Sequence, residues 1–219
     1  MIHTVRVSTW DRSDILAFLR KKRQEGPFRC IDVGGTASGW SGEVIDAICD
    51  INTPTTSSIR HFQMDITNPD DWTQVDAYVK EHGPFDFSIC THTLEDISNP
   101  KFVLKKLAEI SKEGYIAVPS KYIELARFEN PRYPYRGYIH HRWIFSIRDN
   151  RFVGYPKLPY LEQDSFFDSI ASTKKDTIDL SFYWKDSIPF SIINNDYLGP
   201  SGDAIVGYYR TLEKDDLDV

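Results

Sequence analysis

The sequence predicts an α/β fold, in which a mostly parallel sheet carries helices on both of its faces. Two observations support this prediction. Short apolar runs of strand length alternate with helical or loop segments over the first 120 residues. Glycine or proline follows several of these runs, at points where the chain would have to turn. After residue 120 the alternation stops and aromatic residues become frequent.

The first expected elements are a helix and a buried strand. Residues 13–24 place Ile15, Leu16 and Leu19 at helical spacing, and Gly26 and Pro27 end this helix. Residues 28–33 form a short apolar run that stops at two glycines. This is the pattern of a strand buried in the middle of a sheet.

Four further strands and two helices complete the first half of the chain. The strands are expected at residues 44–51, 60–66, 85–91 and 115–119. One helix is expected at residues 69–81, where Pro69 follows Asn68, and the other at residues 101–111, directly after Asn99 and Pro100. Proline suits the first turn of a helix, and the acidic residues of the earlier one suit the positive end of the helix dipole.

The second half is expected to add strands to the sheet. A short helix is predicted at residues 121–128, and a hairpin at 142–148 and 151–155 around Asp149 and Asn150. Three more strand-like runs lie at residues 178–184, 188–194 and 204–211. No linker separates the two halves, so residues 1–219 are expected to form a single domain.

Charge and cysteine content exclude several classes of protein. The chain has 26 basic and 32 acidic residues, and its net charge of −6 argues against nucleic acid or an anionic membrane as a partner. No apolar stretch approaches the roughly 20 residues that cross a bilayer. The three cysteines form no C-x-x-C unit, which argues against a disulfide framework or a zinc site. Because the first residues also lack a signal-peptide pattern, a cytoplasmic location is expected.

The candidate site lies at the carboxyl ends of the predicted strands, where open parallel sheets bind their ligands. Gly34 and Gly35 lack a Cβ atom, so the backbone can turn and approach a ligand there. Asp50 ends the second of these strands and could accept hydrogen bonds from ribose hydroxyls, or simply terminate the strand. Asp65 follows the third and could hold the amino edge of an adenine. These residues together indicate a cofactor that contains a nucleoside.

At this point the sequence resembles a known family. The segments CIDVGGTASGW, AICDIN, FQMDI and FDFSICTHTLEDISNPKFVLKKLAEISKEGYIAVPS resemble class I S-adenosylmethionine-dependent methyltransferases. The later PSKYIELARF and YRGYIHHRWIF resemble a subgroup of small methyltransferase-like proteins of glycan or surface-polymer pathways. The chain departs from the family at Thr36 and Ser38, which occupy the second and third glycine positions of its pattern.

The resemblance implies a Rossmann-like, seven-stranded, mostly parallel sheet with helices on both faces. Residues 1–125 would form the cofactor-binding core, and residues 126–219 the aromatic-rich acceptor side and the final strands. S-adenosylmethionine is the implied cofactor, and no metal is expected. In this family's terms Asp32, Gly34 and Gly35 would line its methionine part, Asp50 its ribose, Asp65 its adenine, and Thr91 and His92 its sulfonium end.

The acceptor side is expected in the tyrosine-rich segment. His140 and His141 are the first candidates for a general base, and His92 is the next. Adjacent histidines on a strand would point to opposite sides, so one of the pair is expected to be structural. The side chains that could form a floor for a sugar ring, or pack in the core, are Tyr133, Tyr135, Tyr138 and Trp143. Glu95 is a weaker candidate, since such residues usually cap loops or form ion pairs.

The sequence thus favours a methyltransferase that acts on a hydroxyl of a sugar or glycan. One alternative is methylation of a small metabolite or a protein side chain. Another is a degenerate fold that acts as a binding module, which Thr36 and Ser38 would support. A nicotinamide-dependent reductase is disfavoured, because no G-x-G-x-x-G motif is present.

Overall fold

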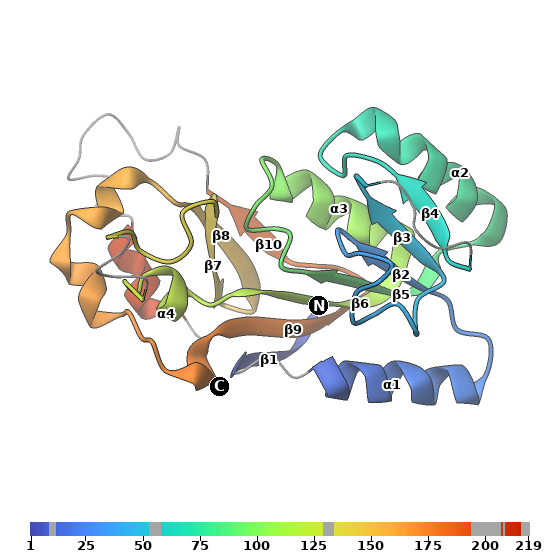
Figure 1. The fold of residues 1–219 in the computed structure, drawn as a ribbon, viewed down its shortest axis with the longest axis horizontal. Coiled ribbons are helices and arrows are strands. Elements are labelled where there is room, and N and C mark those ends of the chain that lie inside the picture. The colour runs from blue at the N-terminus through green and yellow to red at the C-terminus, as the bar shows by residue number, and fades with distance from the viewer. Residues whose placement is uncertain (9–11, 53–57, 129–133, 194–206, 208, 216–219) are drawn as a thin grey trace.

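The computed structural model describes residues 1–8, 12–52, 58–128, 134–193, 207 and 209–215. Its main sheet has seven strands in the order β1-β9-β6-β5-β2-β3-β4 (Figure 1). The strands are β1 (Ile2–Ser8), β2 (Cys30–Val33), β3 (Ala47–Asp50), β4 (Arg60–Gln63), β5 (Phe85–Thr91), β6 (Ser111–Pro119) and β9 (Asp179–Lys185). The helices are α1 (Arg12–Glu25), α2 (Thr73–His82), α3 (Pro100–Ile110) and α4 (Lys121–Glu124).

The strands β2 to β6 run parallel, and β9 pairs antiparallel with both β6 and β1. The Rossmann-like, mostly parallel sheet of seven strands predicted from the sequence is therefore confirmed. From β2 the chain moves outward through β3 and β4 and then returns to β5 on the other side of β2. In open parallel sheets this reversal opens a crevice at the carboxyl ends of the two strands.

Helices cover both faces of this sheet (Figure 1). On one face, Ile15 and Leu19 of α1 pack with Ile48 of β3 and Ile89 of β5. The other face is covered by α2 and α3, whose apolar side chains are buried against the sheet. Both segments begin as predicted: Asn68 caps the 3-10 turn Pro69–Trp72 that leads into α2, and Asn99 caps α3.

The second half of the chain also builds a smaller sheet, β10-β8-β7. Its strands are β7 (Trp143–Arg148), β8 (Arg151–Pro156) and β10 (Phe190–Ile192). Asp149 and Asn150 have positive φ angles of 50° and 55°, which confirms the predicted tight hairpin turn. This sheet packs on the main one, where the rings of Phe152 and Phe182 lie 5.0 Å apart between centroids.

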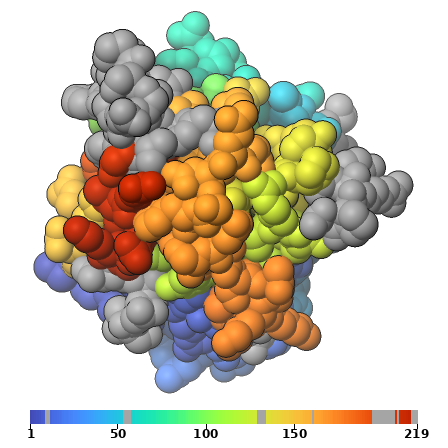
Figure 2. Space-filling view, turned by 90° about the vertical axis from the view of Figure 1, so that its left-hand side faces the viewer, coloured from blue at the N-terminus to red at the C-terminus, as the bar shows by residue number. Residues whose placement is uncertain are grey.

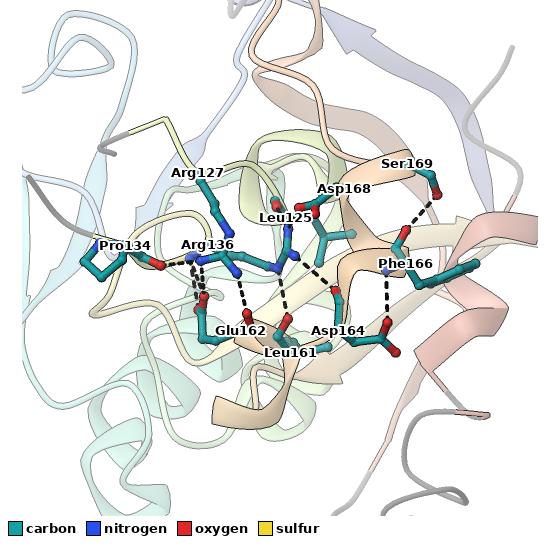
Figure 3. A network of polar contacts seen from close by, with 10 residues as sticks. All are labelled: Leu125, Arg127, Pro134, Arg136, Leu161, Glu162, Asp164, Phe166, Asp168 and Ser169. Atoms are coloured by element: carbon teal, nitrogen blue, oxygen red, sulfur yellow. Dashed lines mark hydrogen bonds and ion pairs between the residues drawn. The ribbon is translucent and has the colours of Figure 1, made fainter. Parts of the chain in front are cut away.

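Short 3-10 turns close the end of the molecule that Figure 2 shows. They are Pro159–Glu162, Ser165–Ser169, Lys175–Thr177 and Arg210–Lys214. Buried Arg136 ties this end together by donating to the carbonyls of Leu125 (2.8 Å), Leu161 (2.9 Å) and Asp164 (3.1 Å) (Figure 3). The segment that carries the candidate histidines is thereby held to the turns after β8.

Three expectations about the strands were wrong. The strand β1 was not predicted, because it is a partly exposed edge strand in which Val5 and Val7 alternate with polar residues. The predicted strand at 188–194 is shorter and joins the small sheet instead of the main one. A strand was also predicted at residues 204–211. Residues 204–206 and 208 lie outside the described residues, and Arg210 and Thr211 belong to a 3-10 helix instead.

The three cysteines pack as small apolar side chains. Cys30 lies in the core beneath α1, and Cys49 and Cys90 lie in the core beneath α2 and α3. Among the described residues, no helix has the length and apolar character needed to cross a bilayer.

Candidate functional site

Two cavities flank Gly34 and Gly35 at the crevice between β2 and β5. The first, of about 260 Å³, is lined by Asp32, Gly35, Trp40, Thr91 and His92, together with Arg12, Thr36, Gly39 and Ser41. The second, of about 200 Å³, is lined by Asp50, Asp65 and the apolar side chains of Ile51, Met64, Ile66 and Ile97, together with Gly34 and Cys49. The structure therefore brings together all the residues predicted to bind the cofactor.

Asp32 is buried at the floor of the first cavity. Ser41 donates a hydrogen bond of 2.5 Å to its Oδ2 atom, whereas Oδ1 is buried without a hydrogen-bond partner. Burial raises the pKa of Asp32 to about 6, although the hydrogen bond from Ser41 opposes this shift. A buried carboxylate oxygen without a donor is the feature that a ligand carrying N–H groups would satisfy.

The two glycines fit this floor because they have no side chain. Gly34 has a φ angle of +87°, and a Cβ atom there would lie 2.4 Å from Thr93. A Cβ atom on Gly35 would lie 2.4 Å from the carboxylate of Asp32. Gly34 is thus required for its backbone conformation and for its lack of a side chain, and Gly35 is required for its lack of a side chain.

The segment after Gly35 shows how Thr36 and Ser38 are accommodated. Residues 37–44 form consecutive turns, and Gly39 donates to the carbonyl of Thr36 at 2.8 Å. No helix forms between β2 and β3. The crevice is therefore lined here by a turn rather than by the N-terminus of a helix.

The second cavity combines carboxylates with an apolar wall. Asp50 Oδ1 accepts hydrogen bonds from Asn52, and Asp65 Oδ1 accepts them from the backbone and hydroxyl of Thr67 at 2.8 and 2.7 Å. Each carboxylate is oriented by its own loop while it lines the cavity. Carboxylate oxygens suit the hydroxyls of a sugar, and the isoleucine and methionine side chains suit a flat base.

His92 lies at the end of β5, between two buried carboxylates. Its Nδ1 atom is 3.4 Å from Glu95 Oε1, and its Nε2 atom is 3.5 Å from Asp179 Oδ1. Its backbone has a φ angle of +49°, which is uncommon for a residue with a side chain. Burial lowers the pKa of His92, but hydrogen bonds and charge from Asp179 and Glu95 outweigh burial and raise that pKa to about 9.

At neutral pH His92 is therefore protonated, and a protonated imidazole cannot accept a proton. Burial raises the pKa of Glu95, although the hydrogen bond and charge of His92 oppose this shift. Glu95 pairs with His92, whereas an arginine or a lysine was the ion-pair partner expected for it. Asp179 was missed, because β9 lies 87 positions further along the chain than His92 (179 − 92) and no local pattern marks it.

His140 and His141 do not point in opposite directions. They precede β7 in a turn instead of lying on a strand, so the expected alternation does not apply. Their Nε2 atoms lie 3.9 and 3.7 Å from the same atom, Asp96 Oδ1. His140 is exposed, whereas His141 is nearly buried and its Nδ1 lies 2.6 Å from Glu124 Oε1.

The predicted aromatic side chains surround this pair. Tyr138 contacts His141, with ring centroids 4.7 Å apart. Trp143 lines a cavity of about 480 Å³ together with both histidines, and Tyr135 lines a neighbouring cavity of about 310 Å³ with His141. Tyr133 lies outside the described residues.

One loop connects the crevice to the histidine pair. The backbone N–H groups of Arg142 and Trp143 donate to the carbonyl of Glu95, at 2.6 and 3.2 Å. The indole N–H of Trp143 donates to the carbonyl of Ile97 at 2.8 Å, and Ile97 also lines the second cavity. The histidine pair is thus anchored to the loop that carries His92.

Comparison with known proteins gives similarities at the level of the fold. No family model and no curated protein matches the chain. One similar structure is the methyltransferase domain of bacterial-CtHen1-CN, with 11% identity over 79% of this chain and 96% of that one, and a TM-score of 0.45. Another is the plantazolicin methyltransferase BpumL in complex with SAH, with 12% identity over 78% and 81% and a TM-score of 0.43.

A third similar structure is the N-terminal domain of EvdMO1 with SAH bound, where SAH denotes S-adenosylhomocysteine. It shares 11% identity over 81% of this chain and 82% of that one, with a TM-score of 0.42. The function proposed for this chain rests on the geometry of its own crevice. That crevice combines the two required glycines, a buried carboxylate with an unpaired oxygen, and a cavity of about 200 Å³ lined by Asp50 and Asp65.

Proposed function

We propose that this chain is an S-adenosylmethionine-dependent methyltransferase and that its acceptor is a hydroxyl of a sugar or glycan. The main support is that the two cavities meet at Gly34 and Gly35 and differ in chemistry. S-adenosylmethionine consists of an amino acid and a nucleoside joined through a sulfonium, so it would need one cavity for each of these two parts. The resemblance of the sequence to methyltransferases supports the same cofactor.

The described residues fit the cofactor. The unpaired Oδ1 of Asp32 would accept a hydrogen bond from its ammonium group, and Asp50 would accept hydrogen bonds from the ribose hydroxyls. Asp65 and the apolar wall of the second cavity would hold the adenine. Thr91 and His92 would line the sulfonium end, and the carboxylates of Glu95 and Asp179 lie on either side of His92.

When bound, the cofactor supplies a methyl group that is already activated for transfer. The protein then has to orient the acceptor oxygen and provide a place for its proton. Because His92 is held protonated, it acts in this proposal as a positioning group and not as the base. The proton therefore leaves toward the side of the crevice that holds Asp96, His140 and His141.

A sugar or glycan is the preferred acceptor for two reasons. The aromatic side chains of Tyr135 and Trp143 line open cavities beside the histidine pair, where a sugar ring could pack. The segments 119–128 and 135–145 also resemble the glycan-pathway subgroup. Methylation of a metabolite or a protein side chain would use the same cofactor site and differ only at these cavities.

The other two alternatives are weaker on structural grounds. A binding module that had lost the cofactor would not need an open crevice at Gly34 and Gly35. A nicotinamide-dependent enzyme places the pyrophosphate at the N-terminus of the helix after its first strand. Between β2 and β3 this chain has turns and no helix.

Calorimetry with S-adenosylhomocysteine tests the cofactor, and transfer of a labelled methyl group tests the acceptor. We expect one S-adenosylhomocysteine per chain, and a ligand at about 100 times its Kd should stabilise the chain by about 2.7 kcal/mol. Labelled methyl should pass to sugars or glycans with free hydroxyls and not to the same sugars with those hydroxyls blocked. Absence of binding at millimolar ligand would refute the cofactor, and labelling of peptides or amines alone would refute the acceptor.

A further inference from the structure

We propose that Asp96, His140 and His141 form a binding site for a divalent transition-metal ion on the acceptor side of the crevice. One ligand atom from each residue lies within 4.8 Å of the others. Asp96 Oδ1 is 3.7 Å from Nε2 of His141 and 3.9 Å from Nε2 of His140. The three residues come from two segments that are far apart in the sequence.

These separations are close to those of a filled site. A metal bonded to three ligands at about 2.1 Å sets the ligand atoms about 3.0–3.5 Å apart in octahedral or tetrahedral geometry. The two distances to Asp96 would have to shorten by roughly 0.2–0.9 Å, and the two histidine nitrogens, which lie within 4.8 Å of each other, would have to approach to the same range. The side chains of His140 and Asp96 are 65% and 43% exposed, so they are free of the close packing that would prevent this movement.

His141 is already oriented as a metal ligand. Its Nδ1 atom lies 2.6 Å from Glu124 Oε1, and a carboxylate can only accept a hydrogen bond, so Nδ1 carries the proton. In the neutral imidazole the lone pair is then on Nε2, the atom that faces Asp96. A carboxylate that holds the outer nitrogen of a histidine is the usual support of a metal ligand.

This supporting carboxylate is itself fixed. Glu124 is fully buried, and Lys157 Nζ donates to its Oε2 atom at 2.8 Å. Gly137 packs directly on it: a Cβ atom there would lie 2.4 Å from Oε2, and the backbone has a φ angle of +58°. The position of His141 is therefore determined by buried contacts from α4, from the residue after β8 and from the turn before β7.

The opposite side of the site is also built in place. The backbone of Arg142 and Trp143 is bonded to the carbonyl of Glu95, immediately before Asp96. This joins the turn that carries the histidines to the loop that carries the carboxylate. Beyond the three ligands lies the cavity of about 480 Å³ that Trp143 also lines, which leaves room for water or an acceptor oxygen to complete the coordination.

The donor set indicates the class of ion. Two imidazoles and one carboxylate favour zinc, manganese, iron or cobalt over magnesium and calcium, which prefer oxygen ligands alone. The absence of a C-x-x-C unit does not bear on such a site, because it uses no thiolate. The sequence pattern missed it because the strand assumed for residues 140 and 141 would have separated the two rings.

The role of the ion rests on the proposed function. It would bind the acceptor hydroxyl and lower the pKa of that group. The O–H proton would pass to water, and the oxygen electron pair would form the bond to the methyl carbon. The carbon–sulfur bond would break with its electron pair remaining on sulfur, so the sulfonium would become a neutral thioether.

Equilibrium dialysis of the full chain, first stripped with a chelator, tests the site with Zn²⁺ and Co²⁺. We expect one ion per chain and a visible d–d absorption for Co²⁺ that Zn²⁺ abolishes. Asp96→Asn and His140→Ala, which change exposed side chains, should each weaken binding at least tenfold. Glu124→Gln should weaken it about 10- to 100-fold through His141. His82→Ala, on α2 and remote from the site, is the matched control and should bind normally.

S-adenosylhomocysteine affinity is measured on the same variants. If Asp96→Asn and His140→Ala bind S-adenosylhomocysteine with unchanged affinity, these variants are folded and their loss of metal binding is specific. The metal site and the cofactor site are then tested independently of each other. The proposal is overturned if the wild-type chain binds no stoichiometric ion. It is equally overturned if Asp96→Asn and His140→Ala bind it as tightly as the control.

Discussion

Replacing Asp32 by asparagine should change how the stability of the chain depends on pH. Burial raises the pKa of this carboxyl group from 3.8 to about 6. An aspartate that folds into such a site holds its proton more tightly in the folded than in the unfolded chain. Between these two pKa values the folded state therefore binds more protons, and the free energy of unfolding falls as the pH rises.

The size of the effect follows from the shift. A difference of about two pKa units corresponds to about 3 kcal/mol at pH values above both. Asp32 is 1% exposed, so solvent does not screen this value appreciably. About 2 kcal/mol of the change should fall between about pH 4.5 and pH 7.5. Asparagine does not titrate, so wild type should lose this stability relative to Asp32→Asn as the pH is raised.

Urea unfolding followed by tryptophan fluorescence, at several pH values in that range, measures the difference. The other titrating groups are present in both proteins and largely cancel. Ser41→Ala should steepen the wild-type dependence, because the hydrogen bond from Ser41 lowers the pKa of Asp32. S-adenosylhomocysteine should flatten it, because its amino group would supply the missing donor to Oδ1. Parallel curves for wild type and Asp32→Asn across the range would refute the reasoning.

Three further substitutions test the rest of the site. Asp50→Ala should reduce the affinity for S-adenosylhomocysteine, measured by calorimetry, about tenfold, because one charge-assisted hydrogen bond is lost. Its Tm should stay nearly constant. If Asp50→Ala binds as tightly as the control variant Glu81→Ala, Asp50 does not belong to the site. Gly34→Ala should destabilise the chain by about 1–3 kcal/mol in urea, since it strains the backbone and meets Thr93; wild-type stability would contradict this. Glu124→Ala should lower the free energy of unfolding by about 3–5 kcal/mol, because it leaves His141 and Lys157 without their buried partner. A loss below 1 kcal/mol would show that water replaces the carboxylate.

The parts of the fold that could be predicted depend on local chemistry. Strands β2, β3 and β5 are apolar runs that have to be buried on both faces, and such runs are visible in the sequence. The asparagine–proline starts at Asn68 and Asn99 reflect capping within a few residues. Edge strand β1 escaped prediction because half of its side chains face solvent, so it never forms an apolar run.

The residues that we propose to bind the cofactor could be selected from the sequence for a related reason. Its residues follow successive strands of one parallel sheet, and topology alone brings the ends of such strands to one edge. Asp32, Gly34, Gly35, Asp50 and Asp65 could therefore be selected without knowledge of any contact. Their grouping around two adjoining cavities agrees with that prediction.

The sequence by itself determined where the buried strands β2, β3 and β5 lie along the chain, the caps of the helices that follow β4 and β5, and the glycine turn after β2, because each depends on neighbours along the chain. Only the tertiary structure decided that Asp179 meets His92, that Glu124 orients His141, and that both histidines face Asp96. These contacts join segments 17 to 87 residues apart (141 − 124 and 179 − 92). They depend on strand register and on how the small sheet packs on the large one, which no single stretch of the chain encodes.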